Sequence, residues 1–153
     1  MGAILRWLMV DLVSVQVADA SGVSFTWQIT WQELNGEFRL TPSEPGTERT
    51  WSALGPDLFD ALCDLRRQLE STGIRICVSG ARTDAYPSGM SRDMGGGRMV
   101  YLLHRPGRLR RLLRLPAWRP GKLVDLFSSA PCGLVGSVDE QRNYYEKWVR
   151  GEA

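Results

Sequence analysis

The chain has 153 residues, of which 43% are hydrophobic, and a formal net charge of +2. This length and apolar content predict a single domain, residues 1–153, with a core of its own, and the small net charge excludes a polycation. The apolar N-terminus is broken by Arg6 and Asp11, a poor pattern for a signal peptide, and no run approaches the length of a membrane helix. We therefore expect a cytoplasmic protein with reduced cysteines.

The first third of the chain predicts a β-meander. Apolar and polar residues alternate from Val13 to Val17 and again from Val23 to Trp31, which is the period of half-buried strands. Asn35-Gly36 follows, the preferred pair for a type I′ hairpin turn. That turn sets Trp31 opposite Leu40, and the alternation of the two strands agrees with this register.

A helix is predicted after Pro56, which suits a first helical turn, with Thr72-Gly73 as its end. Its apolar stripe consists of leucines at helical spacing, Leu58, Leu62, Leu65 and Leu69. The other side carries a row of aspartates, Asp57, Asp60 and Asp64. This row is either a solvated face with acid at the helix N-terminus or an acidic face that binds a partner.

Two apolar runs, 74–78 and 99–103, have the length of buried strands and flank a long Gly-rich loop. Compact domains rarely keep such a loop without a structural or functional reason. Its polar residues are the main candidates for binding a ligand or partner, since binding residues concentrate on loops. They are Arg82, Asp84, Tyr86, Ser88, Ser91, Arg92, Asp93 and Arg98.

The segment from Arg98 to Lys122 contains eight basic and no acidic residues, so the rest of the chain is net acidic. Such segregation is typical of an interacting surface or simply of a solvated face. Residues 109–115 predict two turns of amphipathic helix between two prolines. Candidates for a partner face here are Arg108, Arg111 and Trp118, and contact with nucleic acid is an alternative.

The last predicted elements are a short strand, 123–127, and a helix that starts at Ser137, where Ser137 and Glu140 have the capping-box pattern. One face of this helix carries Val138, Gln141, Tyr145 and Trp148. Together the elements predict an α+β fold. Its antiparallel sheet combines the N-terminal β-meander with the central and late strands, and two helices pack on one face.

The sequence offers little for catalysis. His104 is the only histidine, which excludes a metal cage of histidines, and we expect neither metal nor cofactor. Cys63 fits an apolar core position, as does Cys77. Cys132, His104 and Asp125 are the residue types of an activated thiol, but nothing in the local sequence marks Cys132 as a nucleophile.

Two features of the Gly-rich loop leave alternatives open. Asp84 and Asp93 are either a pair of acid–base carboxylates or residues that hydrogen-bond their own backbone. Gly95–Gly97 has the composition of a phosphate-binding turn. However, a strand is predicted after it where phosphate-binding motifs need a helix, so these glycines fit a turn back to the sheet better.

The run SGARTDAYPSGMSRDMGGG (79–97), Tyr101, the 123–127 strand and the helix with Glu140-Gln-Arg resemble a group of small bacterial proteins. Their length and makeup are similar to those of immunity proteins that neutralise polymorphic or contact-dependent toxins. The resemblance implies a non-catalytic protein that covers a cognate toxin. The alternatives are a small enzyme or a ligand- or phosphate-binding domain that uses the 81–98 loop, and then a nucleic-acid-binding protein.

Overall fold

The computed structural model describes residues 10–104, 107–113 and 121–153. They form a mixed α+β fold with antiparallel strands, as predicted. Within these residues, none of the helices is both long enough and apolar enough to cross a membrane.

The N-terminal part of the described chain forms a five-stranded antiparallel sheet in the order β4-β3-β2-β1-β5. The predicted hairpin register is confirmed, because Trp31 pairs with Leu40 and both turn residues have positive φ, 54° at Asn35 and 82° at Gly36. The strands are β1 (Asp11–Ala18), β2 (Ser24–Leu34), β3 (Glu37–Ser43), β4 (Ala53–Gly55) and β5 (Arg75–Ile76).

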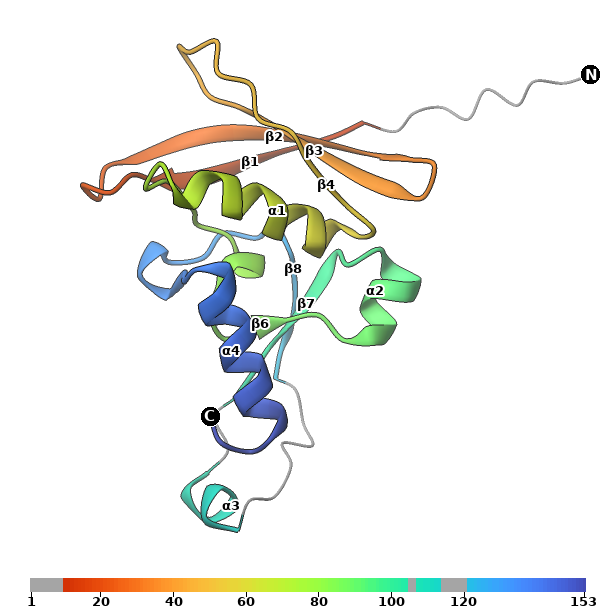
Figure 1. Cartoon of the computed structure of the whole chain (residues 1–153), viewed down its shortest axis with the longest axis vertical. Coiled ribbons are helices and arrows are strands. Elements are labelled where there is room, and N and C mark those ends of the chain that lie inside the picture. Colours follow the sequence, from red (N-terminus) through yellow and green to blue (C-terminus); the bar gives the residue numbers. More distant parts are fainter. Residues whose placement is uncertain (1–9, 105–106, 114–120) are drawn as a thin grey trace, which may run out of the picture.

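Helix α1 (Leu58–Glu70) lies along the inner face of this sheet (Figure 1). It begins two residues after Pro56, because the Asp57 side chain accepts a hydrogen bond from the backbone N–H of Asp60 and caps the helix. The predicted leucine stripe is fully buried against the inward residues of β1, β2 and β3, among them Val15, Val17, Trp27, Ile29 and Leu40. The apolar periodicity of the sequence therefore predicted correctly which side of α1 packs against the sheet.

The predicted strand at 74–78 joins the first sheet as β5, but the strands after it form a second antiparallel sheet, in the order β6-β7-β8, where a single sheet was predicted. The chain leaves the first sheet after β5, which pairs with β1 over two residues, and turns through the 3₁₀ helix η1 (Ser79–Ala81). The other elements are β6 (Ala85–Tyr86), α2 (Gly89–Gly95), β7 (Met99–Leu102), α3 (Arg108–Leu112), β8 (Leu123–Asp125), η2 (Cys132–Leu134) and α4 (Val138–Val149).

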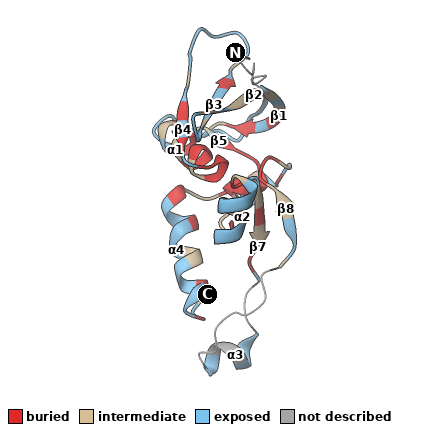
Figure 2. Cartoon of the chain, turned by 90° about the vertical axis from the view of Figure 1, so that its right-hand side faces the viewer, coloured by how far each residue is buried: buried red, intermediate tan, exposed pale blue. Residues whose placement is uncertain are grey.

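Helix α4 joins the second sheet to α1. Its predicted capping box is present, with Ser137 Oγ accepting from the Glu140 N–H and the Glu140 carboxylate accepting from the Ser137 N–H. Its buried residues, Val138, Gln141 and Trp148, lie on the predicted face. Figure 2 shows burial concentrated between α1 and the strands, whereas α3 lies at the far end of the molecule and is exposed.

A buried polar pair joins α1, α4 and the segment that precedes α2. Arg66 of α1 is 4% exposed and Gln141 of α4 is 1% exposed. The Arg66 guanidinium donates to Gln141 Oε1 and to the backbone carbonyl of Gly136 at 2.8 Å. Gln141 Nε2 lies within hydrogen-bond distance of the carbonyl oxygens of Gly80 (2.8 Å), Arg82 (2.9 Å) and Ala85 (2.7 Å). Burial lowers the pKa of Arg66, but guanidinium stays charged in proteins, so these acceptors are required.

We expect Gln141→Leu to lower the free energy of unfolding by about 2–4 kcal/mol, because it removes one acceptor of a buried cation and leaves several buried carbonyls without a donor. Urea denaturation followed by circular dichroism measures the change. The control is Arg142→Ala on the exposed side of α4, where Arg142 pairs with Glu146, and we expect a change below about 0.5 kcal/mol there. Equal effects of the two substitutions would contradict the role of the buried pair.

Cys77 and Cys132 form a disulfide, so the expectation of reduced cysteines is wrong for this pair. Cys77 is a buried residue at the end of β5, as expected, but its sulfur is bonded to Cys132 of η2, 55 residues later. The bond holds η2 beside the first sheet and so positions the start of α4. Cys63 is free and buried, and burial raises the pKa of its thiol to about 11.

We expect the disulfide to contribute about 4 kcal/mol, since it closes a loop of 55 residues in the unfolded chain. Cys132→Ser should lower the urea midpoint accordingly and remove its sensitivity to dithiothreitol. Thiol titration of the unreduced, urea-unfolded wild type should find one reactive thiol. Three reactive thiols would show that the bond does not form in solution.

Candidate functional site

The predicted 81–98 loop is largely ordered structure. It contains the end of η1, strand β6 and the seven-residue helix α2. A helix of this length is not stable alone in water, so contacts with the rest of the chain must hold α2 in place. Most of the polar residues that the sequence singled out make these contacts.

Two serines hold the first turn of α2. Ser88 is its N-cap, with Oγ accepting from the Ser91 N–H at 3.1 Å. Ser91 Oγ in turn donates to the Met99 carbonyl of β7 at 2.6 Å. At the other end Gly96 has φ 60° and ends the helix, and its carbonyl accepts from the Leu58 N–H at 2.8 Å. Helix α2 is thus joined to both β7 and the start of α1.

Arg92 makes the strongest charged contact of α2. Its Nη1 lies 2.9 Å from an Asp60 carboxylate oxygen and 3.2 Å from one of Asp57, and its guanidinium lies 5.0 Å from the centre of the Phe59 ring. Burial acts to lower the pKa of Arg92, but the carboxylates of Asp60 and Asp57 outweigh it and raise that pKa. Arg92 and two members of the predicted aspartate row therefore satisfy one another within the chain.

The glycine run has the backbone of a turn back to the sheet. Gly96 and Gly97 have positive φ, as expected for a turn back to the sheet. A Cβ on Gly97 would lie 2.9 Å from Asp57 Oδ1, so a carboxylate already occupies the space beside this turn. The repulsion between that carboxylate and a phosphate argues against anion binding here.

Arg82, Asp84 and Arg98 also make intramolecular ion pairs. Arg82 donates twice to the Asp84 carboxylate, both at 2.7 Å. Arg98 donates to Asp125 at 3.1 Å and lies over the Trp31 ring at 5.6 Å. Because Asp84 is paired with Arg82 and Asp93 is an exposed residue of α2, the structure gives no support to an acid–base pair of these two carboxylates.

Tyr86 belongs to an aromatic stack between β6 and α4. Its ring is stacked on Tyr145 at a centroid distance of 3.9 Å and meets Phe59 edge-on at 5.1 Å. Burial raises the pKa of Tyr86. Beside the stack is a cavity of about 120 Å³, the size of a single side chain. Its lining residues are Tyr86, Pro87, Ser88, Tyr101, Leu103, Tyr145 and Trp148.

The other residues that were predicted to form a partner face lie in different parts of the structure. Asp57 is buried, so it does not lie on an exposed acidic face. Asp64 accepts from the Leu54 N–H at 3.2 Å and so holds β4 against α1. Arg108 is exposed on α3. Trp118 and the side chain of Arg111 lie outside the described residues.

The structure does not assemble the hypothetical nucleophile set. Cys132 is bonded to Cys77 and is therefore no free thiol. Asp125 pairs with Arg98 and accepts from the Phe127 N–H, and the backbone carbonyl of His104 accepts from the Trp148 indole. Among the described residues, no group of three histidines, cysteines or carboxylates is placed to hold a metal ion.

The exposed side of α2 carries two large apolar residues. Met90 is 73% exposed and Met94 is 84% exposed, four residues apart on the same side of the helix, and Asp93 is exposed beside them. We name these three residues the α2 face. Asp93 was predicted from the sequence, but neither methionine was, since their i,i+4 spacing has meaning only once residues 89–95 are known to be helical.

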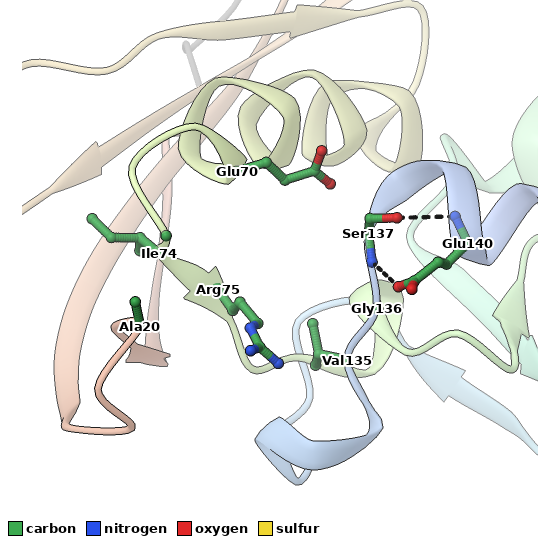
Figure 3. Close-up of a pocket in the computed structure, with 9 residues that line it drawn as sticks. Ala20, Glu70, Ile74, Arg75, Val135, Gly136, Ser137 and Glu140 are labelled. Atoms are coloured by element: carbon green, nitrogen blue, oxygen red, sulfur yellow. Dashed lines mark hydrogen bonds between the residues drawn. The ribbon is translucent and has the colours of Figure 1, made fainter.

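A groove of about 390 Å³ lies between the end of α1, β5 and the start of α4 (Figure 3). Arg75 points into it from β5. Its two glutamates serve the helix start, because Glu140 completes the capping box and Glu70 accepts from the Val138 N–H at 2.8 Å. Because both glutamates accept hydrogen bonds at the start of α4, their presence in the groove has a structural explanation.

Comparison of the chain with protein-family models and with curated proteins gave no match. The resemblance to toxin-immunity proteins therefore stays a prediction.

We expect Arg92→Leu to release α2, because it removes both ion pairs and leaves Asp57 and Asp60 facing each other without a cation. Amide hydrogen exchange should then quicken at least tenfold over residues 89–97, while β1 and β2 keep their protection. Arg39→Leu, at an exposed position of β3, is the control. Unchanged exchange in Arg92→Leu would show that α2 is held by other contacts.

Proposed function

We propose that the protein is a non-catalytic protein-binding protein that contacts its partner through the α2 face, Met90, Asp93 and Met94. One observation carries this proposal: Ser91 and Arg92 of α2 are engaged within the chain, whereas the two methionines of α2 are exposed. A pair of exposed methionines on a firmly held helix has little structural purpose of its own.

The physical chemistry of methionine suits a contact surface. Its unbranched thioether adapts to irregular partner surfaces, and burying one such side chain gains about 1.5–3 kcal/mol. Because the backbone of α2 is already fixed by Ser88, Ser91 and Arg92, binding does not have to order it. The loss of conformational entropy on association is correspondingly small.

Charge near the α2 face favours a basic partner. Phe38 of β3 lies against the end of α2, since a Cβ on Gly96 would be 3.0 Å from its ring. Glu33 pairs with Phe38 across the hairpin, so it lies on the same face of the sheet, and it is exposed. With Asp93, it places negative charge beside the apolar pair, which speeds association with a positively charged surface.

The concrete form that we propose is an immunity protein of a bacterium, which neutralises a cognate toxin by covering its active site. The support is the resemblance of residues 79–97 and the segments after them, together with a surface suited to covering a basic cleft. A small enzyme that uses residues 81–98 is the alternative, but the ion pairs of Arg82, Arg92 and Arg98 leave few free polar groups for it.

Two further expectations remain proposals. Binding of nucleic acid through the basic segment is supported by the exposure of Arg108 at the far end of the molecule. A cytoplasmic location is also proposed, although the Cys77–Cys132 bond is of a kind that persists in oxidising compartments.

The decisive experiment is co-expression with the product of the adjacent open reading frame. We expect a 1:1 complex and relief of growth inhibition by that product. Met90→Glu combined with Met94→Glu should weaken the complex at least a hundredfold by calorimetry, since charge is forced into an apolar contact. The matched control is Leu134→Glu, a comparably large change at an exposed leucine of η2.

Loss of the complex in Leu134→Glu, with full binding by the double methionine variant, would place the contact elsewhere. Absence of any complex, together with turnover of a small molecule that depends on Asp84 or Arg98, would favour the enzyme instead.

A further inference from the structure

A second, unrelated feature of the fold is an apolar groove at the opposite end of the sheet. Its volume is about 570 Å³, within the range of small-molecule sites. Val17 and Trp27 of the sheet are buried in its floor, and Phe25, 49% exposed, stands at its edge. The remaining lining residues are Asp19, Thr26, Glu44, Pro45, Thr72 and Ile74.

The groove exists because the sheet is longer than the helix that covers it. Strand β2 has 11 residues and spans about 36 Å. Helix α1 has 13 residues and spans about 20 Å. Near the β2–β3 turn, the uncovered part of the sheet meets Gly96 and Arg98 through Phe38 and Trp31. Near the β1–β2 turn the described chain supplies no such cover, and the inner face stays open beside Thr72 and Ile74.

The charged residues that line the groove in the described structure are both carboxylates. Asp19 is fixed by hydrogen bonds from the N–H groups of Ser21 (2.9 Å) and Val23 (3.0 Å). The hydrogen bond from the Ser21 hydroxyl lowers the pKa of Asp19, so its charge is present at neutral pH. Glu44 accepts from the Thr47 hydroxyl at 3.0 Å, which orients its carboxylate. Two fixed negative charges thus border an apolar floor.

We propose that this groove binds a small organic cation with an apolar body, the body lying on Trp27, Phe25 and Ile74 and the ammonium group lying near Glu44 and Asp19. Charge complementarity selects the cation, and the aromatic walls favour it further, since rings attract cations at their faces. The apolar body gains free energy by covering the exposed ring of Phe25 and the half-buried side chain of Ile74. This site is independent of the α2 face.

The test uses three probes of the same shape, 4-phenylbutylamine, 4-phenylbutanol and 4-phenylbutyrate, titrated into the whole chain and followed by calorimetry and by the indole N–H of Trp27 in NMR spectra. We expect the amine to bind at least tenfold more tightly than the alcohol, and the carboxylate to bind most weakly. Glu44→Gln should weaken binding of the amine about fivefold to tenfold and leave binding of the alcohol unchanged.

The matched control is Glu48→Gln, which removes the same charge from the same loop at an exposed residue outside the groove lining. Phe25→Ser should weaken all three probes. The proposal would be overturned if the amine and the alcohol bound with equal affinity, or if the two glutamine variants had equal effects. It would also be overturned if none of the probes shifted the indole N–H signal of Trp27. A second copy of the chain that closes the groove would also overturn it. Sedimentation would then show a dimer that dissociates in the Glu44→Gln variant.

Discussion

The second half of this fold depends on satisfying one buried cation. Arg66 lies inside the protein, and its acceptors are Gln141 and backbone carbonyls that come together only when α1, α4 and the segment around η1 are assembled. A guanidinium removed from water without those acceptors is strongly unfavourable, so partly assembled forms are penalised. Gln141 extends the same constraint to the carbonyls of Gly80 and Ala85. The position of β6, and of α2 after it, follows from this pair together with the Cys77–Cys132 bond.

A mismatch in length between the first sheet and α1 explains where the protein has surface available for binding. Helix α1 covers the middle of the inner face, and each end of the sheet extends beyond it. At one end, α2 and Arg98 lie against Phe38 and Trp31, and α2 exposes its two methionines there. At the other end the apolar face is open and bordered by Asp19 and Glu44. The apolar groove is thus a consequence of this mismatch, whereas the α2 face belongs to the helix that lies against the other end of the sheet.

The polar residues in the segment before β7 have a structural role that could not be inferred from the composition of the segment. Ser88 caps a helix, Ser91 ties it to β7, and Arg92 neutralises Asp57 and Asp60 beside the start of α1. Such groups are typical of ligand-binding loops, but here they satisfy backbone and charge within the chain. The apolar residues between them are left outside, which reverses the usual expectation that the polar side chains of a loop are the ones that meet a partner.

The sequence by itself determined the elements whose signals are local: the β2–β3 hairpin with its register, the leucine stripe of α1, and the capping box and buried face of α4. Each was predicted from a repeat of apolar residues, or from a turn or capping residue, within about a dozen positions of the chain. Only the tertiary structure decided that the late strands form their own sheet, that 89–95 is helical, and that Cys77 meets Cys132. These features depend on partners distant in sequence, such as Asp57 for Arg92 and Gln141 for Arg66. Short segments have too little propensity of their own to reveal such pairings before the chain is folded.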